Sequence, residues 1–438
     1  MFVDVPNRIE PYVPTLKLNE PVEVFSGVFK ILRKGDEIGN FTGAVVFRWF
    51  PTAKFEILGD YLGSALELGD SDLALIVEEA NLTIPIVLTR INGFNGSLPI
   101  TGQFCRPARI ATNSYFDTLL FSLVNFPHYI AAWIKSDSAT SSGRLEVSSP
   151  RYRVVVDEIE ETKELRDTAR TEGGVFISHV CELSVRDGPI DLNSIDELLK
   201  MLHLFFGFVR GAWAGPVFPR GHLQNEQVWA EFDNWVIDEP TAVTTWLPQR
   251  PDLNDMFKGF VARWENEDWR DPLTTAIAWY VEANSSRLAN EARIVLAQCA
   301  LELLANFTLV ETERLFAKTD YEKLSAAGRI RALCHYLKIP PDIPSHLSDL
   351  KVLRDSETID GAGVVVRVRN ALVHAAERKR KFIQLVSGSQ RFQAAQLSLQ
   401  YVELTLLALF GYRGKYARRG WQGWRGDEEA PVPWVDTV

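Results

Sequence analysis

Residues 289–309 read ANEARIVLAQCALELLANFTL, and we expect the last third of the chain to fold around this stretch. Its side chains are apolar nearly all round at helical spacing, which is typical of a helix that is buried on most sides. Four polar side chains are the exceptions, and at 100° per residue they fall within one narrow sector. They are Glu291, Gln298, Glu302 and Asn306. This polar stripe faces either water or a cleft or subunit seam.

Helical patterning continues on both sides of the central stretch and predicts an all-α bundle over residues 270–425. The segment DPLTTAIAWYVEAN begins with Asp-Pro, which suits an N-cap followed by the first helical turn. A linker is expected at 251–269, after a loop rich in Pro and Asp, and a tail at 426–438. The expected helices cover 271–284, 289–309, 322–337, 364–386 and 390–410, the last stopped by Gly411.

The N-terminal part differs from the C-terminal third in the spacing of its apolar residues. Alternating apolar residues and turn signals predict an antiparallel β-rich domain over residues 1–160, with RYRVVVDEI (151–159) as one strand. Residues 161–250 read as a mixed α/β continuation of this region. Within it, DLNSIDELLKMLHLFFGFVRG predicts a helix capped by Asp191 or Asn193 and closed by Gly211. The predicted fold class is therefore α+β multidomain, a β-rich domain followed by a helical bundle.

Charge is divided unevenly along the 438 residues, whose formal net charge is −10. Residues 351–438 hold 14 Lys and Arg against 9 Asp and Glu, a net of +5, so the first 350 residues carry −15. A basic end on an acidic chain suits a polyanion that is handled at one place. We also expect the acidic N-terminal part to restrain the basic end by docking on it, a contact that salt would weaken.

Several classes of protein are disfavoured by the sequence. The N-terminus lacks a signal-peptide pattern, and the most apolar stretch is interrupted by polar residues, so we expect a cytoplasmic protein without a membrane span. The four cysteines lie far apart, and neither they nor the histidines show ligand spacing. No metal and no cofactor are expected, and no phosphate-binding loop or nucleophile motif is found.

The segment RNALVH places Arg369, Asn370 and His374 on what we expect to be one helix, with Arg367 a further candidate. Asn370 and His374 are spaced i,i+4 and so lie on one face. A histidine can exchange a proton at neutral pH, a guanidinium can brace a phosphorane, and a carboxamide can orient a phosphate oxygen. These residue types suit RNA cleavage, although an arginine and a histidine on a helix are more often structural.

The same segment resembles the Arg-x4–6-His signature of HEPN domains in its Arg-Asn-x3-His form. AIAWYVEAN-SSRLANEARIVLAQCALELLANF is similar to the two opening helices of ApeA-like HEPN proteins, and YVELTLLALFGYRGKYARRGWQG to their closing helix and tail. The resemblance covers residues 270–425, while the N-terminal part is similar to ApeA only in texture and position. It implies a HEPN helical bundle in the C-terminal third.

What the resemblance implies is a metal-independent endoribonuclease, often a bacterial antiphage, abortive-infection or toxin-type effector. Arg369 and His374 would be catalytic and Asn370 the polar residue after the arginine, while Glu302 matches the glutamate of the ALE-L helix. Cleavage of single-stranded RNA, with transfer RNA as one target, would leave a 2′,3′-cyclic phosphate and a 5′-hydroxyl. A homodimer or higher homo-oligomer would bring two motifs to one cleft.

Other readings stay open. HEPN bundles also serve as non-catalytic adaptors that bind nucleotides, RNA or proteins, and an antitoxin-like inhibitor of another nuclease is a third option. The N-terminal domain offers no readable chemistry, and we expect it to sense a trigger, such as a phage-derived one, or to restrain the nuclease.

A run of four cations follows the motif, namely Arg378, Lys379, Arg380 and Lys381. They read either as the solvated last turns of a helix, where cations are favourable, or as an RNA-binding element. Aromatic residues lie among the basic residues that follow, and they either stack on RNA bases or pack the tail onto the bundle. These are Tyr412, Tyr416, Trp421 and Trp424.

Overall fold

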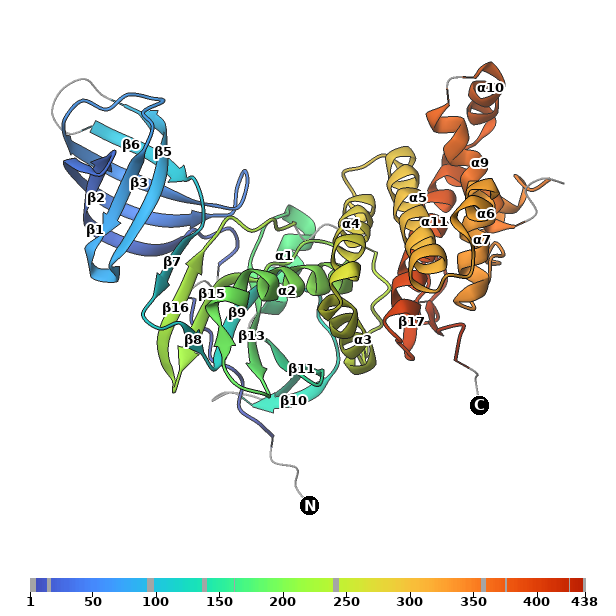
Figure 1. Cartoon of the computed structure of the whole chain (residues 1–438), viewed down its shortest axis with the longest axis horizontal. Helices are drawn as coiled ribbons and strands as arrows, with labels where there is room; N and C mark the ends of the chain where they lie inside the picture. The colour runs from blue at the N-terminus through green and yellow to red at the C-terminus, as the bar shows by residue number, and fades with distance from the viewer. Residues whose placement is uncertain are drawn as a thin grey trace.

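The computed structural model describes residues 5–13, 17–92, 98–135, 140–160, 162–238, 244–355, 360–374, 376–424 and 426–435. A closed barrel, a large antiparallel sheet and a helical part follow one another along the long axis of the molecule (Figure 1). The predicted α+β multidomain class, β-rich first and helical last, is confirmed.

The barrel occupies residues 22–104, with neighbouring strands antiparallel and β4 returning to β1. The inward-facing side chains of its alternating pattern, such as Ile31 and Phe41, are fully buried. Gly43 and Gly59 face each other across β2 and β3, and a Cβ on Gly43 would lie 2.2 Å from the Leu58 carbonyl oxygen. The barrel strands, in spatial order, are β1 (Val22–Arg33), β2 (Asp36–Arg48), β3 (Lys54–Gly63), β6 (Leu98–Phe104), β5 (Leu82–Ile91) and β4 (Leu73–Val77), with the 3-10 turn η1 (Glu78–Ala80) between β4 and β5.

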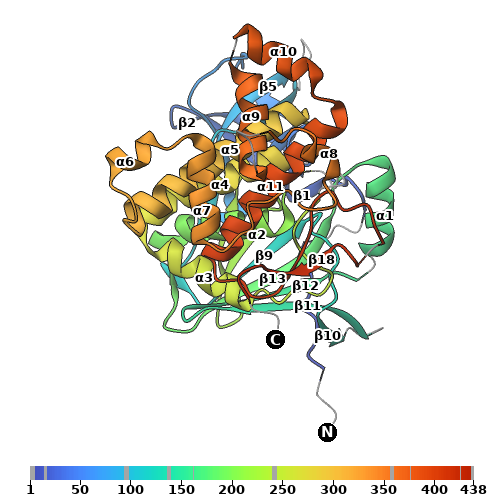
Figure 2. The same cartoon turned by 90° about the vertical axis from the view of Figure 1, so that its right-hand side faces the viewer.

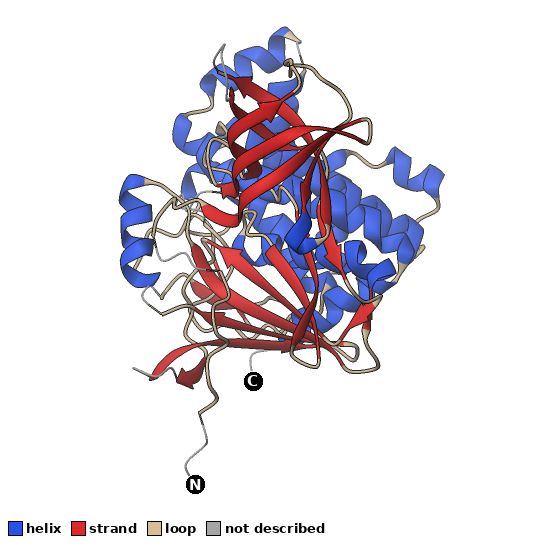
Figure 3. Cartoon of the chain, turned by 90° about the vertical axis from the view of Figure 1, so that its left-hand side faces the viewer, coloured by secondary structure: helices blue, strands red, loops and turns tan. Residues whose placement is uncertain are grey.

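The central sheet contains strands from both sides of the boundary predicted at residue 160. The barrel and this sheet, which Figure 3 shows as two separate groups of strands, are therefore the structural units rather than residues 1–160. The predicted strand around 151–159 forms as β12. Two short strands, β8 (Tyr115–Phe116) and β14 (Ile190–Asp191), pair with each other in a separate antiparallel ladder. The sheet strands, in spatial order, are β10 (Ala132–Lys135), β11 (Thr140–Ser148), β12 (Tyr152–Glu158), β13 (Ile177–Val185), β9 (Thr118–Val124), β15 (Val217–Leu223), β16 (Glu226–Phe232) and β7 (Ala108–Ala111).

Each face of the sheet is covered by apolar packing. α1 (Thr162–Glu172) links β12 to β13, and α2 (Ile195–Arg210) lies on one face, where Phe121 meets Phe206 with ring centroids 5.8 Å apart. The predicted end of this helix is confirmed, whereas its N-cap is Ser194 and the predicted Asp191 caps the turn before it. Asp191 accepts from the backbone of Asn193 at the turn η2 (Leu192–Ser194), and Gly211 ends α2 with φ 73°. Barrel residues pack against sheet residues such as Phe218 on the other side.

The helical part carries the expected helices, with changes at α4 and at the helix predicted over 364–386 (Figure 2). The N-cap of α4 is Asn266, whose side chain accepts from the backbone of Asp268, so the Asp-Pro pair predicted as the helix start lies inside the helix. The single helix predicted over 364–386 is two helices, α9 and α10. The remaining bounds are α3 (Asn254–Glu265), α4 (Glu267–Asn284), α5 (Asn290–Asn306) with a π-helical turn (Phe307–Thr312), α6 (Lys318–Lys323), α7 (Ala326–Tyr336), α8 (Ser348–Lys351), α9 (Gly361–Val373), α10 (Glu377–Leu385), α11 (Gly388–Leu409), β17 (Lys415–Ala417) and β18 (Glu429–Pro431).

The linker predicted at 251–269 is wrong, because α3 fills most of it and packs into the core. Phe260 lies 5.3 Å from Phe410 of the α11 end, centroid to centroid. A Cβ on Gly259 would lie only 1.9 Å from the Phe410 carbonyl oxygen, so α3 and the end of α11 touch through their backbones. One hydrophobic cluster therefore runs from the sheet through α2, α3 and α4 to α11 and α9.

A fully buried arginine ties the C-terminal tail to this body. Arg419 donates from Nε and Nη2 to the two carboxylate oxygens of Glu403, at 2.7 and 2.6 Å. Its Nη2 also reaches Asn284 Oδ1 and the Thr244 carbonyl oxygen, both at 2.9 Å. The ion pair thus joins α11, the end of α4, the segment before α3 and the tail.

The central helix predicted from residues 289–309 is α5. One described segment, Asn290–Thr312, is long and apolar enough to cross a membrane, and 56% of its apolar stretch is buried inside the fold. A core helix of a bundle has the same properties, because it is surrounded by other helices.

Candidate nucleic-acid site on helices α9 and α10

The start of α9 is fixed by Asp360. Its carboxylate accepts from the backbone N–H of Gly363 at 2.8 Å and from Nη2 of Arg331 at 3.0 Å. Burial alone would raise the pKa of Asp360, but the hydrogen bonds from Arg331 and Gly363 outweigh it and hold the pKa below its usual range. The N-cap thereby joins α9 to α7.

The end of α9 differs from the prediction. The helix stops at Val373, and His374 is its C-cap with φ −105° and ψ 127°. α10 then folds back along α9, with the guanidinium of Arg367 4.3 Å from the ring centre of Phe382. The segment HAAERKRK is rich in helix formers, so local propensity predicts continuation, and this tertiary contact overrides it.

A hollow of about 660 Å³ opens between α7, α9 and α10. Arg367 crosses it and donates from Nη1 to Asp355 Oδ2 at 2.5 Å and to the Leu353 carbonyl oxygen at 3.1 Å. The N-terminus of α7 also faces the hollow through its N-cap Ser325, adding a partial positive charge. The described residues lining the hollow are Ser325, Ala327, Asp355, Gly363, Val366, Arg367, Asn370, Ala371, Arg378, Lys379 and Phe382.

The structure brings four predicted residues together here, namely Arg367, Asn370, Arg378 and Lys379. Arg369 lies beside them, since its Nη1 donates to Asn370 Oδ1 at 3.2 Å. Its Nε is buried without an acceptor, and no described carboxylate pairs with it. A guanidinium held in this way has hydrogen-bonding capacity left for a phosphate.

His374 is not among the residues that line the hollow, although its exposed side chain is not enclosed by the bundle core either. Its backbone N–H donates to the Asn370 carbonyl oxygen at 3.2 Å. His374 therefore closes the last turn of α9 four residues after Asn370, and the chain leaves the helix only beyond it.

Glu302 is placed elsewhere. It accepts from Gln298 Nε2 at 2.6 Å within α5, and it adds to the burial that raises the pKa of Tyr321 to about 12. It is not among the residues lining the hollow in the described part of the chain. The polar stripe of α5 is used for internal contacts, as Gln298 is fully buried and Glu291 pairs with Arg391 at 2.7 Å.

The basic run lies in the first turns of α10, not in the last turns of a longer helix. Cations near a helix N-terminus oppose the helix dipole, by about 0.3–1 kcal/mol each at exposed positions. Lys381 finds a partner in Glu377, four residues earlier, at 2.7 Å. Helix stability alone therefore does not account for Arg378 and Lys379 beside the hollow.

The aromatic residues of the tail were expected either to stack on RNA bases or to pack the tail onto the bundle, and they differ in their burial. Tyr412 and Tyr416 are buried, which supports packing of the tail onto the bundle and excludes them as an open stacking surface. Trp424 is 85% exposed, and the guanidinium of Arg418 lies 4.0 Å from the ring centre of Trp421. Among these four residues Trp424 is the exposed one, while Trp421 is half-buried against Arg418 and His346.

Sequence reasoning missed Ser325, Asp355 and Phe382 as residues of this hollow. Ser325 and Asp355 lie far from the motif along the chain, and Phe382 reaches it only because α9 ends at Val373. The one usable signal was the Asp360–Gly363 segment, in which an aspartate precedes a glycine-rich helix start.

Comparison with known proteins gives matches over most of the chain. Residues 266–429 match the family model of the YopA C-terminal domain, and residues 111–243 match that of the YopA central domain. The chain is 24% identical over 414 residues, 92% of each protein, to a Bacillus subtilis (strain 168) protein described as the SPbeta prophage-derived uncharacterized protein YopA. No solved structure matches. The matched segments follow the central sheet and the helical part, leave the barrel outside, and their descriptions name neither HEPN nor ApeA.

Proposed function

We propose that this protein is a metal-independent endoribonuclease of the HEPN type, resembling ApeA-like proteins, whose RNA site is the hollow between α9 and α10 with Arg369 and His374 at its edge. The observation that carries the proposal is the guanidinium of Arg369, which is half-buried, has no carboxylate partner among the described residues and contacts Asn370. Beside it the hollow adds the cations Arg378 and Lys379.

In this proposal each residue has a separate task. Arg369 stabilises the negative charge that builds on the phosphorane, and His374 exchanges a proton with the attacking or leaving oxygen. Asn370 orients a phosphate oxygen, while Arg378 and Lys379 hold a neighbouring phosphate. Attack by the 2′-hydroxyl of single-stranded RNA leaves a 2′,3′-cyclic phosphate and a 5′-hydroxyl. A homodimer would place two such motifs at one groove.

The proposal is tested with the full chain, labelled single-stranded RNA and transfer RNA. We expect His374→Ala and Arg369→Ala each to lower the cleavage rate by at least ~100-fold, the size typical of a lost acid-base group. His335→Ala and Arg186→Ala are matched controls, because both side chains are exposed and lie outside the hollow. The wild-type products should carry a 5′-hydroxyl, and EDTA should leave the rate unchanged. Cleavage that needs a divalent ion, or that survives His374→Ala, would refute the proposal.

A second candidate function has its own support. His374 lies outside the lining of the hollow, while three cationic side chains, Arg367, Arg378 and Lys379, line it, which also suits a non-catalytic adaptor that binds RNA or nucleotides. Under this alternative, RNA binding falls in Arg378→Ala and Lys379→Ala, yet no strand is cut by the wild-type chain. Parallel binding and cleavage assays on the same variants separate the two functions.

The biological setting is part of the proposal. An RNase of this type would act as an abortive-infection effector, with the N-terminal part sensing a phage-derived trigger. The similar Bacillus subtilis protein is described as prophage-derived, which places a relative on a phage genome. Phage plaque counts on cells that express the wild-type chain should fall, and cells with His374→Ala should show no protection.

A further inference from the structure

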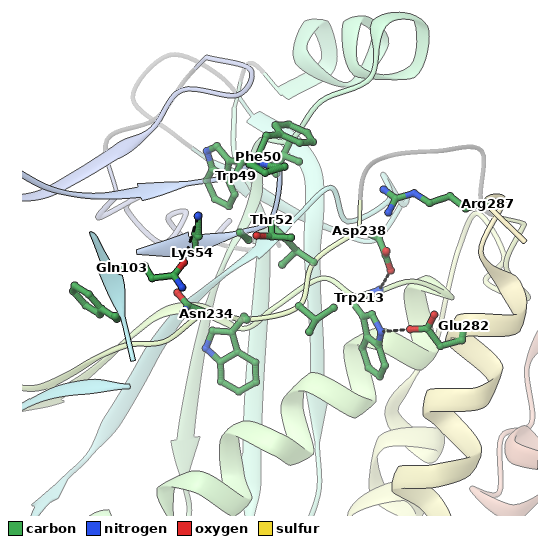
Figure 4. Close-up of a pocket in the computed structure, with 17 residues that line it drawn as sticks. Trp49, Phe50, Thr52, Lys54, Gln103, Trp213, Asn234, Asp238, Glu282 and Arg287 are labelled. Carbon is green, nitrogen blue, oxygen red and sulfur yellow. Dashed lines mark hydrogen bonds between the residues drawn. The ribbon is translucent and has the colours of Figure 1, made fainter. Parts of the chain in front are cut away.

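A second cavity, of about 530 Å³, lies where the barrel, the central sheet and helix α4 meet (Figure 4). The barrel contributes the segment Trp49–Lys54 and Gln103, the segment after β16 contributes 234–238, and α4 with the following loop contributes Glu282 and Arg287. Its size is within the ~300–1,000 Å³ of small-molecule sites, which occur preferentially between domains. We call it the junction cleft.

The apolar part of the junction cleft is rigidly built. Trp213 stacks on His203 with centroids 4.3 Å apart, and its Nε1 donates to Glu282 Oε1 at 3.3 Å. Trp49 is buried and donates from its Nε1 to the Glu20 carbonyl oxygen at 2.7 Å. Phe50 is 38% exposed and gives the cleft an open aromatic ring. Such a wall suits a flat ring that stacks or packs against it.

Hydrogen-bond donors remain open in the junction cleft. Asn234 Oδ1 accepts from the backbone of Phe55 at 2.8 Å, and Gln103 Oε1 accepts from Lys54 Nζ at 3.4 Å. Both carboxamide oxygens are therefore in use, whereas neither amide NH₂ group has an acceptor among the described residues. The indole N–H of Trp235, in the same wall, is buried and also lacks an acceptor.

The two carboxylates of the cleft each accept a hydrogen bond through one oxygen. Asp238 accepts from the backbone of Trp213 at 2.8 Å, and Glu282 accepts from the indole of the same residue. Lys54 and Arg48 both form ion pairs with the carboxylate of Glu56, at 2.8 and 2.9 Å respectively. These three groups together carry a net charge of +1 at the barrel edge. Unused donors beside an aromatic wall favour a ligand that is planar and rich in acceptors.

We infer that the junction cleft binds a nucleoside monophosphate, with the base against the aromatic wall and its acceptor atoms toward Asn234 and Gln103, and with the phosphate toward Lys54. A base presents ring nitrogens and carbonyl oxygens in one plane, and the phosphate supplies further acceptors for the barrel-edge cation. The ligand would touch the barrel, the sheet segment and the end of α4 at once. This site is separate from the α9–α10 hollow and does not depend on RNA cleavage.

Two conservative substitutions test the inference without removing internal contacts. Asn234→Asp keeps the oxygen that accepts from Phe55 but replaces the NH₂ donor by an oxygen, and Gln103→Glu does the same beside Lys54. Gln227→Glu is the matched control, since it makes the same charge change on an exposed residue of β16 outside the cleft. Thermal melting of each variant checks that the fold is unchanged.

Binding is measured by isothermal titration calorimetry on the full chain with AMP, GMP, CMP and UMP in turn. We expect at least one to bind with a Kd below 1 mM, and expect Asn234→Asp and Gln103→Glu each to weaken it at least ~10-fold, the factor for one lost hydrogen bond. Gln227→Glu should bind as the wild type does. The matching nucleoside should bind more weakly, and inorganic phosphate should give no measurable heat.

Three outcomes would overturn the inference. They are no heat from any of the four nucleotides, equal affinity in the wild type and both cleft variants, or binding of inorganic phosphate as tight as that of the nucleotide. Because calorimetry records binding and not strand cutting, failure here and failure of the endoribonuclease proposal are distinguished.

Discussion

At the scale of single residues, the informative groups are those whose hydrogen-bonding capacity is not met inside the chain. Arg367 and Arg419 are both tied to carboxylates, Asp355 and Glu403, so their charges serve the fold. Arg369, two residues after Arg367 in the same helix, has a 3.2 Å bond to Asn370 and no carboxylate partner among the described residues. The arginine that was predicted from the motif is thus also the one with bonding capacity to spare.

Buried histidines give a residue-scale prediction for pH. Burial lowers the pKa of His179 to about 3, with Glu158 opposing and Arg166 and His128 adding to this shift. Between pH ~6.5 and ~3 the unfolded chain binds a proton at this position that the folded chain does not, so the free energy of unfolding falls as the pH falls. At pH 5 this loss is about 2 kcal/mol.

The measurement is urea unfolding between pH 7.5 and 5. In His179→Gln the acid-induced loss should shrink, because no titrating group remains at that position, whereas in His335→Gln the wild-type slope should persist. His203, with a pKa lowered to about 4 by burial, contributes in the same direction in all three proteins. A His179→Gln slope identical to that of the wild type would contradict the assignment.

At the scale of elements, the predictions that succeeded rest on local chemistry. Gly211 ends α2 because it adopts positive φ, and Asp191 caps the preceding turn η2 because it accepts a backbone hydrogen bond; both properties belong to the residue itself. The predicted start of α4 at the Asp-Pro pair was wrong, because Asn266 is also a good N-cap and lies earlier in the chain. The helix break at His374 was not predicted, because it depends on the packing of Arg367 on Phe382, and sequence spacing does not reveal this contact.

The N-cap of α9 gives an element-scale prediction. In Asp360→Ala the helix loses its capping acceptor and Arg331 loses its carboxylate, so we expect the free energy of unfolding to fall by about 2 kcal/mol. Asp360→Asn keeps an oxygen for the Gly363 N–H and should recover part of this loss. Chemical denaturation of the two variants measures both effects. Equal losses in Asn and Ala would mean that the Arg331 contact, not the cap, holds the helix start.

At the scale of the whole molecule, the docking of the two halves differs from the expectation based on charge. The sheet and the helical part share one apolar core, and the basic helix α10 lies at the end of the molecule opposite the barrel (Figure 1). Because that interface is apolar, salt is not expected to separate the halves. Restraint of a nuclease by electrostatic docking of the acidic part on α10 therefore has no counterpart in this arrangement.

The shared core also changes what a truncated chain can report. A fragment of residues 265–438 starts after α3 and loses Phe260, which packs on Phe410, and Trp246, whose backbone oxygen accepts from Ala417 at 2.8 Å. It also loses the Thr244 carbonyl oxygen that Arg419 uses. We expect this fragment to aggregate or to melt without a cooperative transition, because removing these segments exposes large aromatic surface and leaves a buried charge network incomplete.

A fragment of residues 244–438 is the matched comparison, since it restores α3 and the Thr244 and Trp246 contacts while still lacking the sheet. We expect it to be more soluble than 265–438 and less stable than the full chain, because the face of α4 that packs on α2 stays uncovered. Circular dichroism melting and gel filtration of the three proteins decide this. If 265–438 is monomeric and melts cooperatively within about 3 °C of the full chain, the size of shift that ~1 kcal/mol produces, then α3 is a dispensable connection and the helical part folds alone.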